Sequence, residues 1–431
     1  MSTRHVAIVG AGLSGALQAI HLARAGARVT LIEREHVPGR GVAYGTDRPE
    51  HLLNVPARRM SGVADDVDHF TRWWAARGGD AEDYAPRMVF GGYVRELLAE
   101  AGESVDIVRG DAVDVEPGER VRLADGRPID ADAVVLALGN LRPALPARIE
   151  TGALGDAWVA DPWAGDFTVG LGPDDVIVLL GTGLTAVDVA LTLDARSFAG
   201  TVLALSRRGL APRAHEPREP MVAPQEELPE TCVGLLRRVR HRAAEIGWRS
   251  AVHELRSVTQ DLWRGAPLAE RRRFLRHLRP WWDVHRHRIA PAVGATIDRM
   301  QAAGRLRFAA GKIVSVVPDG GGARLEWRPR GGDAVESVAA RKVVNCTGPE
   351  LDIVRAGEPL FDALIASGRI RPDVCRIGID VDEELRAIGA DGRPSESLFA
   401  LGPMTRGAFW ESIAVPDIRG QAARIANRLT A

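Results

Sequence analysis

Short runs of apolar residues alternate with amphipathic segments along most of the chain, a pattern typical of α/β proteins. The first run, residues 6–9, is uniformly apolar, as expected for a strand buried on both faces of a parallel sheet. Residues 16–25 have helical spacing, and a second apolar run ends at Glu33. The first forty residues therefore predict a strand, a helix and a second strand.

The loop between the first strand and the helix has the glycine spacing of a dinucleotide-binding fingerprint. Gly10 permits a tight turn, Gly12 lets the backbone approach a pyrophosphate, and Gly15 lets helix and strand pack closely. Leu13 and Ser14 complete the loop, and the helix that follows has N-terminal N–H groups and a positive dipole that attract phosphates. An ordinary glycine-rich loop before a helix is the alternative interpretation.

An acidic residue ends the second strand, about twenty residues after the glycines, as the fingerprint requires. The carboxylate of Glu33 is suited to accept hydrogen bonds from a ribose 2′-OH, and its charge would repel a 2′-phosphate. Glu33, with Arg34 beside it, is therefore expected at the ribose of the first dinucleotide.

The same succession of elements restarts near residue 175. Residues 176–180 and 201–205 are apolar runs, and residues 187–193 between them have helical spacing. A second glycine loop follows the first of these runs, with alanine in the third position, which is an accepted variant. Its expected cofactor-binding residues are Gly181, Thr182, Gly183, Leu184 and Thr185.

The second unit ends its ribose strand with Arg207 and Arg208 instead of an acid. Guanidinium groups bind a phosphate that a carboxylate would reject. We interpret this unit as a site for NADPH in preference to NADH. Two arginines on a solvated strand end are the alternative interpretation.

Further strands and helices are predicted around these two units. Helices are expected over residues 68–77, 93–101 and 416–429. Residues 213–300 are Pro-rich at first and then helical, charged and rich in tryptophan, which indicates a helical insertion. Strands are expected over residues 106–115, 133–138, 306–308, 312–316, 323–327, 341–346 and 397–401.

The composition excludes several classes of protein. With 431 residues the chain is long enough for two or three domains, and a net charge of −1 gives no electrostatic case for a nucleic acid or membrane partner. Three distant cysteines without a CxxC pair indicate neither a dithiol centre nor a zinc ribbon, and suit a reduced, cytoplasmic protein.

His285 and His287 are two apart on a predicted helix and point away from each other, so no metal site is expected. We expect no targeting or membrane-spanning segment.

Two fingerprints in one chain imply two bound dinucleotides, and hydride transfer is the chemistry that connects them. Hydride transfer from NADPH to a second, permanently bound nicotinamide would have no catalytic use. Hydride transfer from NADPH to a flavin does have one. We therefore assign FAD to the first unit and NADPH to the second. The predicted fold is α/β with two Rossmann-like dinucleotide-binding domains: an FAD-binding domain over residues 1–150 and 340–431, and an NAD(P)H-binding domain over 172–339 that carries the insertion at about 213–300.

Several longer motifs resemble those of a known family. They lie at residues 10–15, 41–45, 51–57, 180–186, 345–348, 405–411 and 415–419. Together they resemble the bacterial FAD/NAD(P)-binding oxidoreductases, which are flavoproteins with two dinucleotide-binding domains. At greater distance the chain is similar to class B flavin monooxygenases, including N-hydroxylating enzymes. The resemblance covers nearly the whole chain.

This resemblance implies roles for residues that the local pattern does not assign. Val113 would meet the adenine of FAD. Leu53, Asn54 and Met60 would lie along the ribityl chain or the flavin.

The resemblance also implies roles for two later glycines. Gly139 would sit where the chain crosses between the domains. Gly402 and the start of the last helix, with Ile418, would flank the ribityl and pyrimidine end of the flavin. There the helix dipole would stabilise negative charge on the reduced flavin.

The leading hypothesis is an FAD-dependent NADPH oxidoreductase. More specifically, we expect a monooxygenase that uses dioxygen and a flavin C4a-hydroperoxide to oxidise a small amine or sulfur substrate. The alternative is an NADPH-dependent flavin reductase or dehydrogenase that passes electrons to a small molecule or carrier, and a third class is a non-catalytic nucleotide-binding protein. The missing cysteine pair argues against a disulfide reductase, and the absence of histidine from residues 140–175 argues against a Baeyer–Villiger enzyme. Catalytic residues, substrate and oligomeric state stay unassigned.

Overall fold

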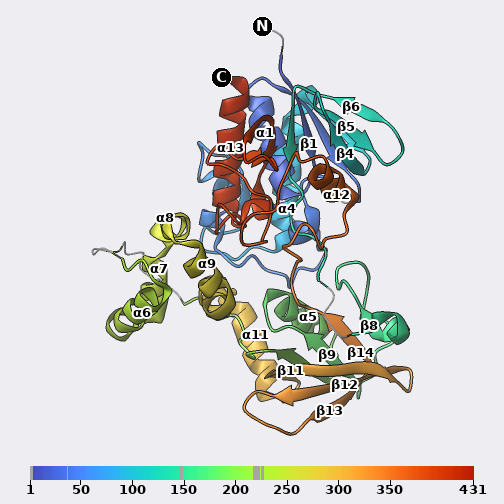
Figure 1. Ribbon diagram of the computed structural model, residues 1–431. Helices are drawn as coiled ribbons and strands as arrows, with labels where there is room; N and C mark the ends of the chain where they lie inside the picture. The colour runs from blue at the N-terminus through green and yellow to red at the C-terminus, as the bar shows by residue number, and fades with distance from the viewer. Residues whose placement is uncertain (1–2, 36, 145–148, 217–223, 225–227) are drawn as a thin grey trace.

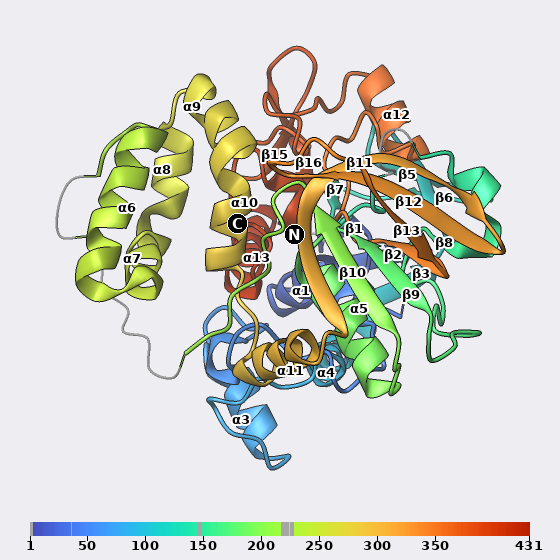
Figure 2. The same cartoon turned by 90° about the horizontal axis from the view of Figure 1, so that it is seen from below.

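The computed structural model describes residues 3–35, 37–144, 149–216, 224 and 228–431. Within these residues the chain forms two large sheets at opposite ends of the molecule, and a group of helices lies to one side of both (Figures 1 and 2). Each sheet has parallel strands at its centre, which confirms the predicted α/β, Rossmann-like fold class. Residues 217–223 and 225–227 of the predicted insertion lie outside the described residues.

The first sheet is built around the strand that precedes the first glycine loop. Its central strands pair in parallel, and the edge strand β15 is antiparallel to its neighbour. Val9 lies opposite Ile32, so the glycine loop and Glu33 leave the sheet at the same edge. The strands in spatial order are β15 (Arg386–Ile388), β16 (Pro394–Ala400), β7 (Ala133–Leu136), β1 (His5–Val9), β2 (Arg28–Glu33) and β3 (Val105–Arg109).

Helices and a small sheet pack around this first sheet. Helix α1 (Leu13–Arg24) contacts both α4 (Arg87–Glu100) and α13 (Val415–Thr430), as Figure 1 shows. Helix α12 (Pro359–Ala366) packs on an antiparallel sheet of three strands. The remaining elements here are β4 (Ala112–Glu116), β5 (Arg120–Leu123), β6 (Pro128–Asp130), α2 (Gly41–Tyr44), η1 (Ala57–Arg59), α3 (His69–Ala75), η2 (Gly102–Ser104) and η6 (Gly402–Thr405).

The second sheet repeats the arrangement around the second glycine loop. Leu180 lies opposite Leu205 in a parallel pair, so this loop and the following arginines again share one edge. The long strand β11 leaves the parallel part and continues into two antiparallel strands. In spatial order the strands are β13 (Glu336–Ala340), β12 (Gly322–Pro329), β11 (Leu306–Asp319), β10 (Thr201–Ser206), β9 (Val176–Leu180), β14 (Lys342–Asn345) and β8 (Trp158–Val159), with α5 (Leu184–Ala195) and η3 (Thr151–Ala157) beside them.

The predicted insertion is helical and stands apart from both sheets (Figures 1 and 2). It ends before residue 300, however, because α11 (Pro291–Ala302) packs on α5 and belongs with the second sheet. The side chain of Thr231 caps the first helix by accepting a hydrogen bond from the Gly234 N–H. The helices are α6 (Cys232–Ile246), α7 (Trp248–Glu254), η4 (Arg256–Val258), α8 (Thr259–Gly265), α9 (Leu268–Arg273), the π-helical η5 (Phe274–Leu278) and α10 (Arg279–Arg286).

The predicted domain boundary at residue 340 is wrong. Strand β14 (Lys342–Asn345) pairs with β9 in the second sheet, whereas the predicted boundary assigns it to the first domain. Strand β8, which lies in neither predicted range, joins the same sheet. The chain returns to the first domain only after Asn345, where its side-chain N–H and the Thr347 hydroxyl both donate to the carbonyl of Ala144. The two segments that connect the domains therefore lie side by side. The first of them follows shortly after Gly139 in the sequence.

Three element predictions also differ from the structure. The alternating run 106–115 forms two strands in different sheets, because β3 ends at Arg109 beside β2 and β4 begins at Ala112 beside β5. The helix expected over 93–101 begins at Arg87. The two strands expected over 306–316 are one continuous strand. Among the helices of the described residues, none combines the length and apolar character that a membrane crossing requires.

Candidate functional site

The first glycine loop has the backbone geometry that its sequence predicts. Gly10 has a φ of +96°, and a Cβ there would lie 2.6 Å from the carbonyl oxygen of Ala137. A Cβ on Gly15 would overlap the carbonyl of Gly10, so helix and strand pack too closely for any side chain. Beside Gly12 the nearest atom to a Cβ is the Gly41 Cα, at 3.6 Å. The loop is therefore closely packed at Gly10 and Gly15 and open at Gly12. The open part fits a pyrophosphate at the N-terminus of α1.

Glu33 lies directly beside this loop. Its buried carboxylate accepts hydrogen bonds of 2.9 Å from the backbone N–H groups of Ala11 and Glu35. The carboxylate thus holds the glycine loop in place at the position where the ribose is expected. The guanidinium of Arg34 forms an ion pair with Glu358 at 2.6 Å, and this hydrogen-bonded pair raises the pKa of Arg34.

The segment after the last strand of the first sheet meets the same loop. Gly402 has a φ of +75°, and a Cβ there would overlap the hydroxyl of Ser14. The Gly402 N–H donates to the Gln421 side chain of α13 at 2.7 Å, and Ile418 of the same helix is buried. This brings the end of β16 and helix α13 against the start of α1, as expected for residues that flank one cofactor.

The other residues expected along FAD are spread over the first domain. Leu53 and Met60 are buried, and the carbonyl of Asn54 accepts a hydrogen bond from the His215 ring at 3.0 Å. Val113 is half-buried on β4, three residues after Gly110, whose N–H donates to the carbonyl of Glu33. Gly139 has a φ of +65° and open space around its Cα. Their roles toward FAD stay predictions.

The second glycine loop has the same local structure as the first. The N-cap residues Gly12 and Gly183 have nearly equal dihedral angles, φ −66° with ψ −166° and φ −83° with ψ −162°. Gly181 has a φ of +136°, and a Cβ there would overlap the carbonyl of Cys346. Around Gly183 no atom lies within 4 Å of a Cβ position. This loop is also open in front, so it fits a second dinucleotide pyrophosphate.

The side chains of the second loop fix it to the strands behind it. The hydroxyl of Thr182 is buried, donates to the Leu210 carbonyl at 2.5 Å and shares a hydrogen bond of 2.9 Å with the Ser206 hydroxyl. Leu184 begins α5, and Thr185 beside it is half-buried. The Thr182 side chain therefore ties the loop to the strand behind it, and the open space at Gly183 stays accessible to a ligand.

The two arginines after β10 are not equivalent. Arg208 is half-buried and donates to the backbone carbonyl of His277 at 2.9 Å, which links the second domain to the insertion. Arg207 is exposed and has no hydrogen bond or ion pair with any residue that the structure describes. A free guanidinium at this strand end is the one suited to bind a ribose 2′-phosphate.

Sequence reasoning missed the residues that connect the two domains. Arg87 at the start of α4 donates two hydrogen bonds, of 2.6 and 3.1 Å, to the carboxylate of Asp188 on α5. The ring of His51 bonds to the hydroxyl of Thr192 at 3.0 Å. Asp188 and Thr192 are four residues apart and share one face of α5, a spacing that could have marked the face as polar and paired. Because α5 carries the second glycine loop at its N-terminus, these contacts set the position of that loop relative to the first domain.

The insertion docks on the first domain through residues that sequence reasoning also left unassigned. The indole N–H of Trp263 donates to the Gly407 carbonyl at 2.8 Å. The backbone N–H of Trp410 donates to the Gln260 side-chain oxygen at 2.9 Å. An aromatic cluster of Trp263, Phe274, Trp282 and Trp410 lies at this junction. The insertion therefore covers the segment 405–411, which follows directly on the Gly402 turn.

Charged groups are buried at the same junction. Arg286 of α10 forms an ion pair with Glu411 at 2.8 Å, with both side chains at most a tenth exposed. Burial and the neighbouring Arg279 lower the pKa of Arg406 to about 10, and burial raises the pKa of Asp283. The residues after 402 and on α10 thus form a desolvated polar cluster between the first domain and the insertion.

This cluster concentrates buried polar atoms without a partner. Among the described residues fifteen buried side-chain N or O atoms have no hydrogen bond, and eight of them lie here. Each would cost about 1–3 kcal/mol if it stayed unpaired, which is why folded proteins rarely leave such groups without a partner or an ordered water. The eight atoms are Trp282 Nε1, Asp283 Oδ1, Arg286 Nε, His287 Nε2, Arg406 Nε, Trp410 Nε1, Glu411 Oε1 and Ser412 Oγ.

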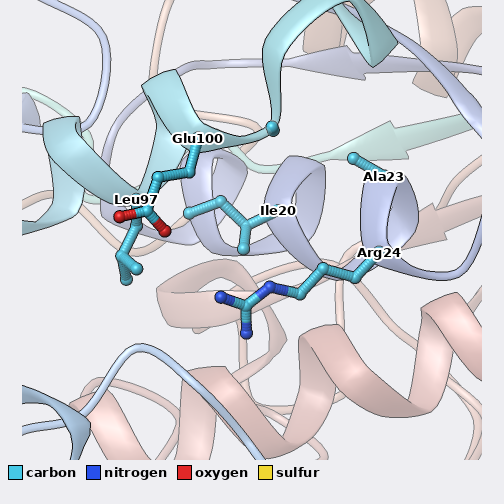
Figure 3. Close-up of a pocket in the computed structure, with 6 residues that line it drawn as sticks. Ile20, Ala23, Arg24, Leu97 and Glu100 are labelled. Atoms are coloured by element: carbon cyan, nitrogen blue, oxygen red, sulfur yellow. The ribbon is translucent and has the colours of Figure 1, made fainter.

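A pocket of about 270 Å³ lies elsewhere, between α1 and α4 (Figure 3). It is lined by Ile20, Ala23, Arg24, Leu97, Glu100 and Ala101. These residues sit at the C-terminal ends of both helices, whereas the glycine loop is at the other end of α1. The pocket contains none of the residues predicted for the dinucleotides.

A comparison with protein-family models agrees with the first of the two sites. Residues 7–141 match the family described as FAD-NAD(P)-binding. The match includes the first glycine loop, Glu33 and Gly139. This part of the chain is therefore similar to FAD/NAD(P)-binding domains.

Solved structures share the fold of the whole chain. The reduced ornithine hydroxylase of Pseudomonas aeruginosa aligns with 100% of this chain and 99% of its own, with 16% identity and a TM-score of 0.68. The ornithine N-hydroxylase of Kutzneria sp. 744, solved with reduced FAD, NADP⁺ and L-ornithine, aligns with 99% of both chains, with 15% identity and a TM-score of 0.67. A thioredoxin reductase of Lactococcus lactis also aligns with 99% of both chains, with 15% identity and a TM-score of 0.56. At these identities the likeness establishes a shared fold.

One curated protein matches over a short stretch. A phytoene dehydrogenase of Streptomyces griseus is 63% identical over 35 residues. The match spans 8% of this chain and 7% of that protein, so it carries no information about the rest of either chain.

Proposed function

We propose that this chain is an FAD-dependent NADPH oxidoreductase and, within that class, a monooxygenase acting on a small amine or sulfur compound. The observation that carries the proposal is the repeated glycine loop, once beside a buried glutamate and once beside an exposed arginine. The first arrangement suits FAD, which has no 2′-phosphate, and the second suits NADPH. We assign FAD to the domain of the first sheet, up to residue 144 and from 346 onward, and NADPH to the domain of the second sheet.

In this proposal the residues of the chain bind the cofactors, orient them and exclude water. The N-terminus of α1 holds the FAD pyrophosphate, and the N-terminus of α13 stabilises negative charge at the pyrimidine edge of the ring system. FAD held there would supply acceptance of hydride from NADPH and, with dioxygen, transfer of one oxygen atom to the substrate while the other leaves as water. The insertion, docked over residues 405–411, keeps bulk water from the reacting groups.

An NADPH-linked reductase is the second candidate, because a thioredoxin reductase shares the fold. Such a reductase would pass electrons to a small molecule or carrier without using thiols of this chain. All three cysteines are free, and burial raises the pKa of each thiol: to about 11 for Cys232, and likewise upward for Cys346 and Cys375. Thiols protonated in this way are poor nucleophiles for disulfide exchange.

A stopped-flow experiment tests the proposed reaction. The purified yellow protein is reduced with NADPH without oxygen and then mixed with aerated buffer. We expect rapid bleaching of the flavin band, followed by a transient absorption of the oxygenated flavin before the oxidised spectrum returns. Substrate candidates, small amines and thioethers, should shorten the lifetime of that transient. Reoxidation without a transient, in the presence of each candidate, would favour the reductase, and no reduction by NADPH would refute both.

Removing the free arginine should change coenzyme preference. We expect Arg207→Ala to raise the KM for NADPH about 10- to 100-fold, because a charge-assisted bond to the 2′-phosphate is lost, and to leave the KM for NADH nearly unchanged. Steady-state oxidation of both coenzymes measures the effect. Arg196→Ala, an exposed arginine at the other end of α5, is the control and should change neither KM. An equal change for both coenzymes would contradict the phosphate-binding role.

A further inference from the structure

The unpartnered atoms between α10 and the segment 405–412 have a consistent chemistry. Four of them are obligate donors, namely the indole N–H groups of Trp282 and Trp410 and the Nε–H groups of Arg286 and Arg406. Only two, on Asp283 and Glu411, are carboxylate oxygens. A group that completes this cluster must therefore be rich in acceptors.

The balance of charge points the same way. The three guanidiniums of Arg279, Arg286 and Arg406 face the two carboxylates of Asp283 and Glu411. Glu411 already pairs with Arg286 at 2.8 Å, and Asp283 lies 3.4 Å from Arg279. One positive charge is left without a counterion.

The groups behind this cluster do not supply the missing negative charge. Arg256 and Asp417 add one charge of each sign. Burial and the nearby arginines lower the pKa of Arg256 to about 10 and keep His287 neutral by lowering its pKa well below the ordinary value.

The cluster is partly exposed at Arg279 and Asp283 and buried at Arg406 and Trp410. The side chains of Arg279 and Asp283 are 32 and 36% exposed, whereas Arg406 and Trp410 are 7 and 2% exposed. The buried end stacks the Arg406 guanidinium on the Trp410 ring, 4.7 Å from its centroid. A small molecule that enters past Arg279 would therefore place its charged end at Arg406.

Two contacts relate the cluster to the proposed cofactor sites. Segment 405–412 follows Gly402, which touches Ser14 at the start of the FAD loop. On the other side, α10 follows directly on the segment whose His277 carbonyl bonds Arg208, beside the expected NADPH ribose. The cluster is thus connected through short chain segments to both proposed cofactor sites.

We infer that this cluster is an anion site that binds a carboxylate of the substrate, with Arg406, Arg286 and the indole N–H of Trp410 as donors. The inference rests on the proposed function and narrows its substrate to amines or sulfur compounds that carry a carboxylate. Charge-assisted bonds from buried guanidiniums would fix the orientation of such a molecule.

Titration calorimetry of the FAD-loaded protein with butyrate tests the inference without turnover. We expect saturable binding of butyrate at millimolar concentration and none of butyramide, its uncharged counterpart. Arg406→Gln should weaken butyrate binding about tenfold or more, as expected for loss of a charged hydrogen-bonding partner. Arg279→Gln, at the exposed edge of the cluster, should also weaken butyrate binding. This variant replaces Arg406→Gln in the test if Arg406→Gln does not fold. Arg240→Gln, an exposed arginine on α6, should bind like the unmodified protein.

Unchanged butyrate affinity in both variants, or absence of butyrate binding, would overturn the inference. A parallel titration with NADP⁺ tests whether the cluster binds a phosphate of the coenzyme instead of a substrate carboxylate. If butyrate competes with NADP⁺ and Arg406→Gln weakens NADP⁺ to the same extent, the cluster binds a coenzyme phosphate and the substrate assignment is wrong. If NADPH fails to reduce the flavin while butyrate still binds, the proposed function is refuted and the anion site stands.

Discussion

Replacing Gly12 by valine is expected to abolish FAD binding while leaving the fold intact. The φ of −66° at this position suits any residue, and the nearest atom to a Cβ is 3.6 Å away, so the chain tolerates a side chain there. The valine would instead fill the space in which the backbone approaches the pyrophosphate. The purified variant should be colourless, which its absorption spectrum measures, and should keep the circular dichroism of the unmodified protein.

The second glycine loop supplies the matched control for this experiment. Gly183 has the same place and nearly the same dihedral angles, so valine there perturbs helix α5 as it would perturb α1 at Gly12. We expect Gly183→Val to remain yellow and to lose reduction by NADPH. A Gly12→Val protein that retains FAD would refute the assignment of the first loop, and loss of FAD from both variants would show general destabilisation.

The two glycine loops could be predicted because their requirements lie within a few consecutive residues. A tight turn at Gly10, an open front at Gly12 and close packing at Gly15 follow from the spacing alone, and the structure has all three. The same holds for Glu33, because its distance along the chain places it at the edge where the loop leaves the sheet. Local rules therefore sufficed for the part of the site that binds phosphates.

The domain boundary was mispredicted because the chain repeats itself. Strands β7 and β14 occupy the same place in their sheets, each paired with the strand that precedes a glycine loop. Their apolar runs look alike, so the sequence pattern could not show to which sheet residues 342–345 belong. Hydrogen bonding between strands, which is not local, decides this point.

The polar cluster and the domain contacts were missed for a related reason. Arg286 and Glu411 are 125 residues apart in the sequence, and neither has a neighbour pattern that identifies its partner. The charge run on α10 is typical of a solvated helix face, and only its docking on residues 405–412 buries it. Such sites depend on tertiary packing, which a single sequence does not reveal.

Breaking the ion pair between the domains is expected to have the largest effect on stability. Arg87 and Asp188 are joined by two hydrogen bonds, and their side chains are 19 and 6% exposed. Arg87→Leu would leave the Asp188 carboxylate buried without its charged partner, which should lower the free energy of unfolding by about 3–5 kcal/mol. Because the pair also fixes α5 and its glycine loop against the first domain, flavin reduction by NADPH should slow. Urea denaturation and anaerobic stopped-flow measure the two effects.

Two further variants separate the buried pair from ion pairs in general. The exposed pair Arg120–Asp130 has a similar distance, 2.7 Å, and Arg120→Leu should leave the free energy of unfolding nearly unchanged, because water screens an exposed ion pair. Adding Asp188→Leu to Arg87→Leu removes the unpaired charge and should recover much of the stability, because an apolar pair of similar volume replaces a buried ionic one. Flavin reduction should stay slow in the double variant if the hydrogen bonds orient the domains. Full recovery of both properties would mean that the contact contributes packing alone, and that the glycine loops are aligned by the His51–Thr192 bond and the surrounding apolar residues.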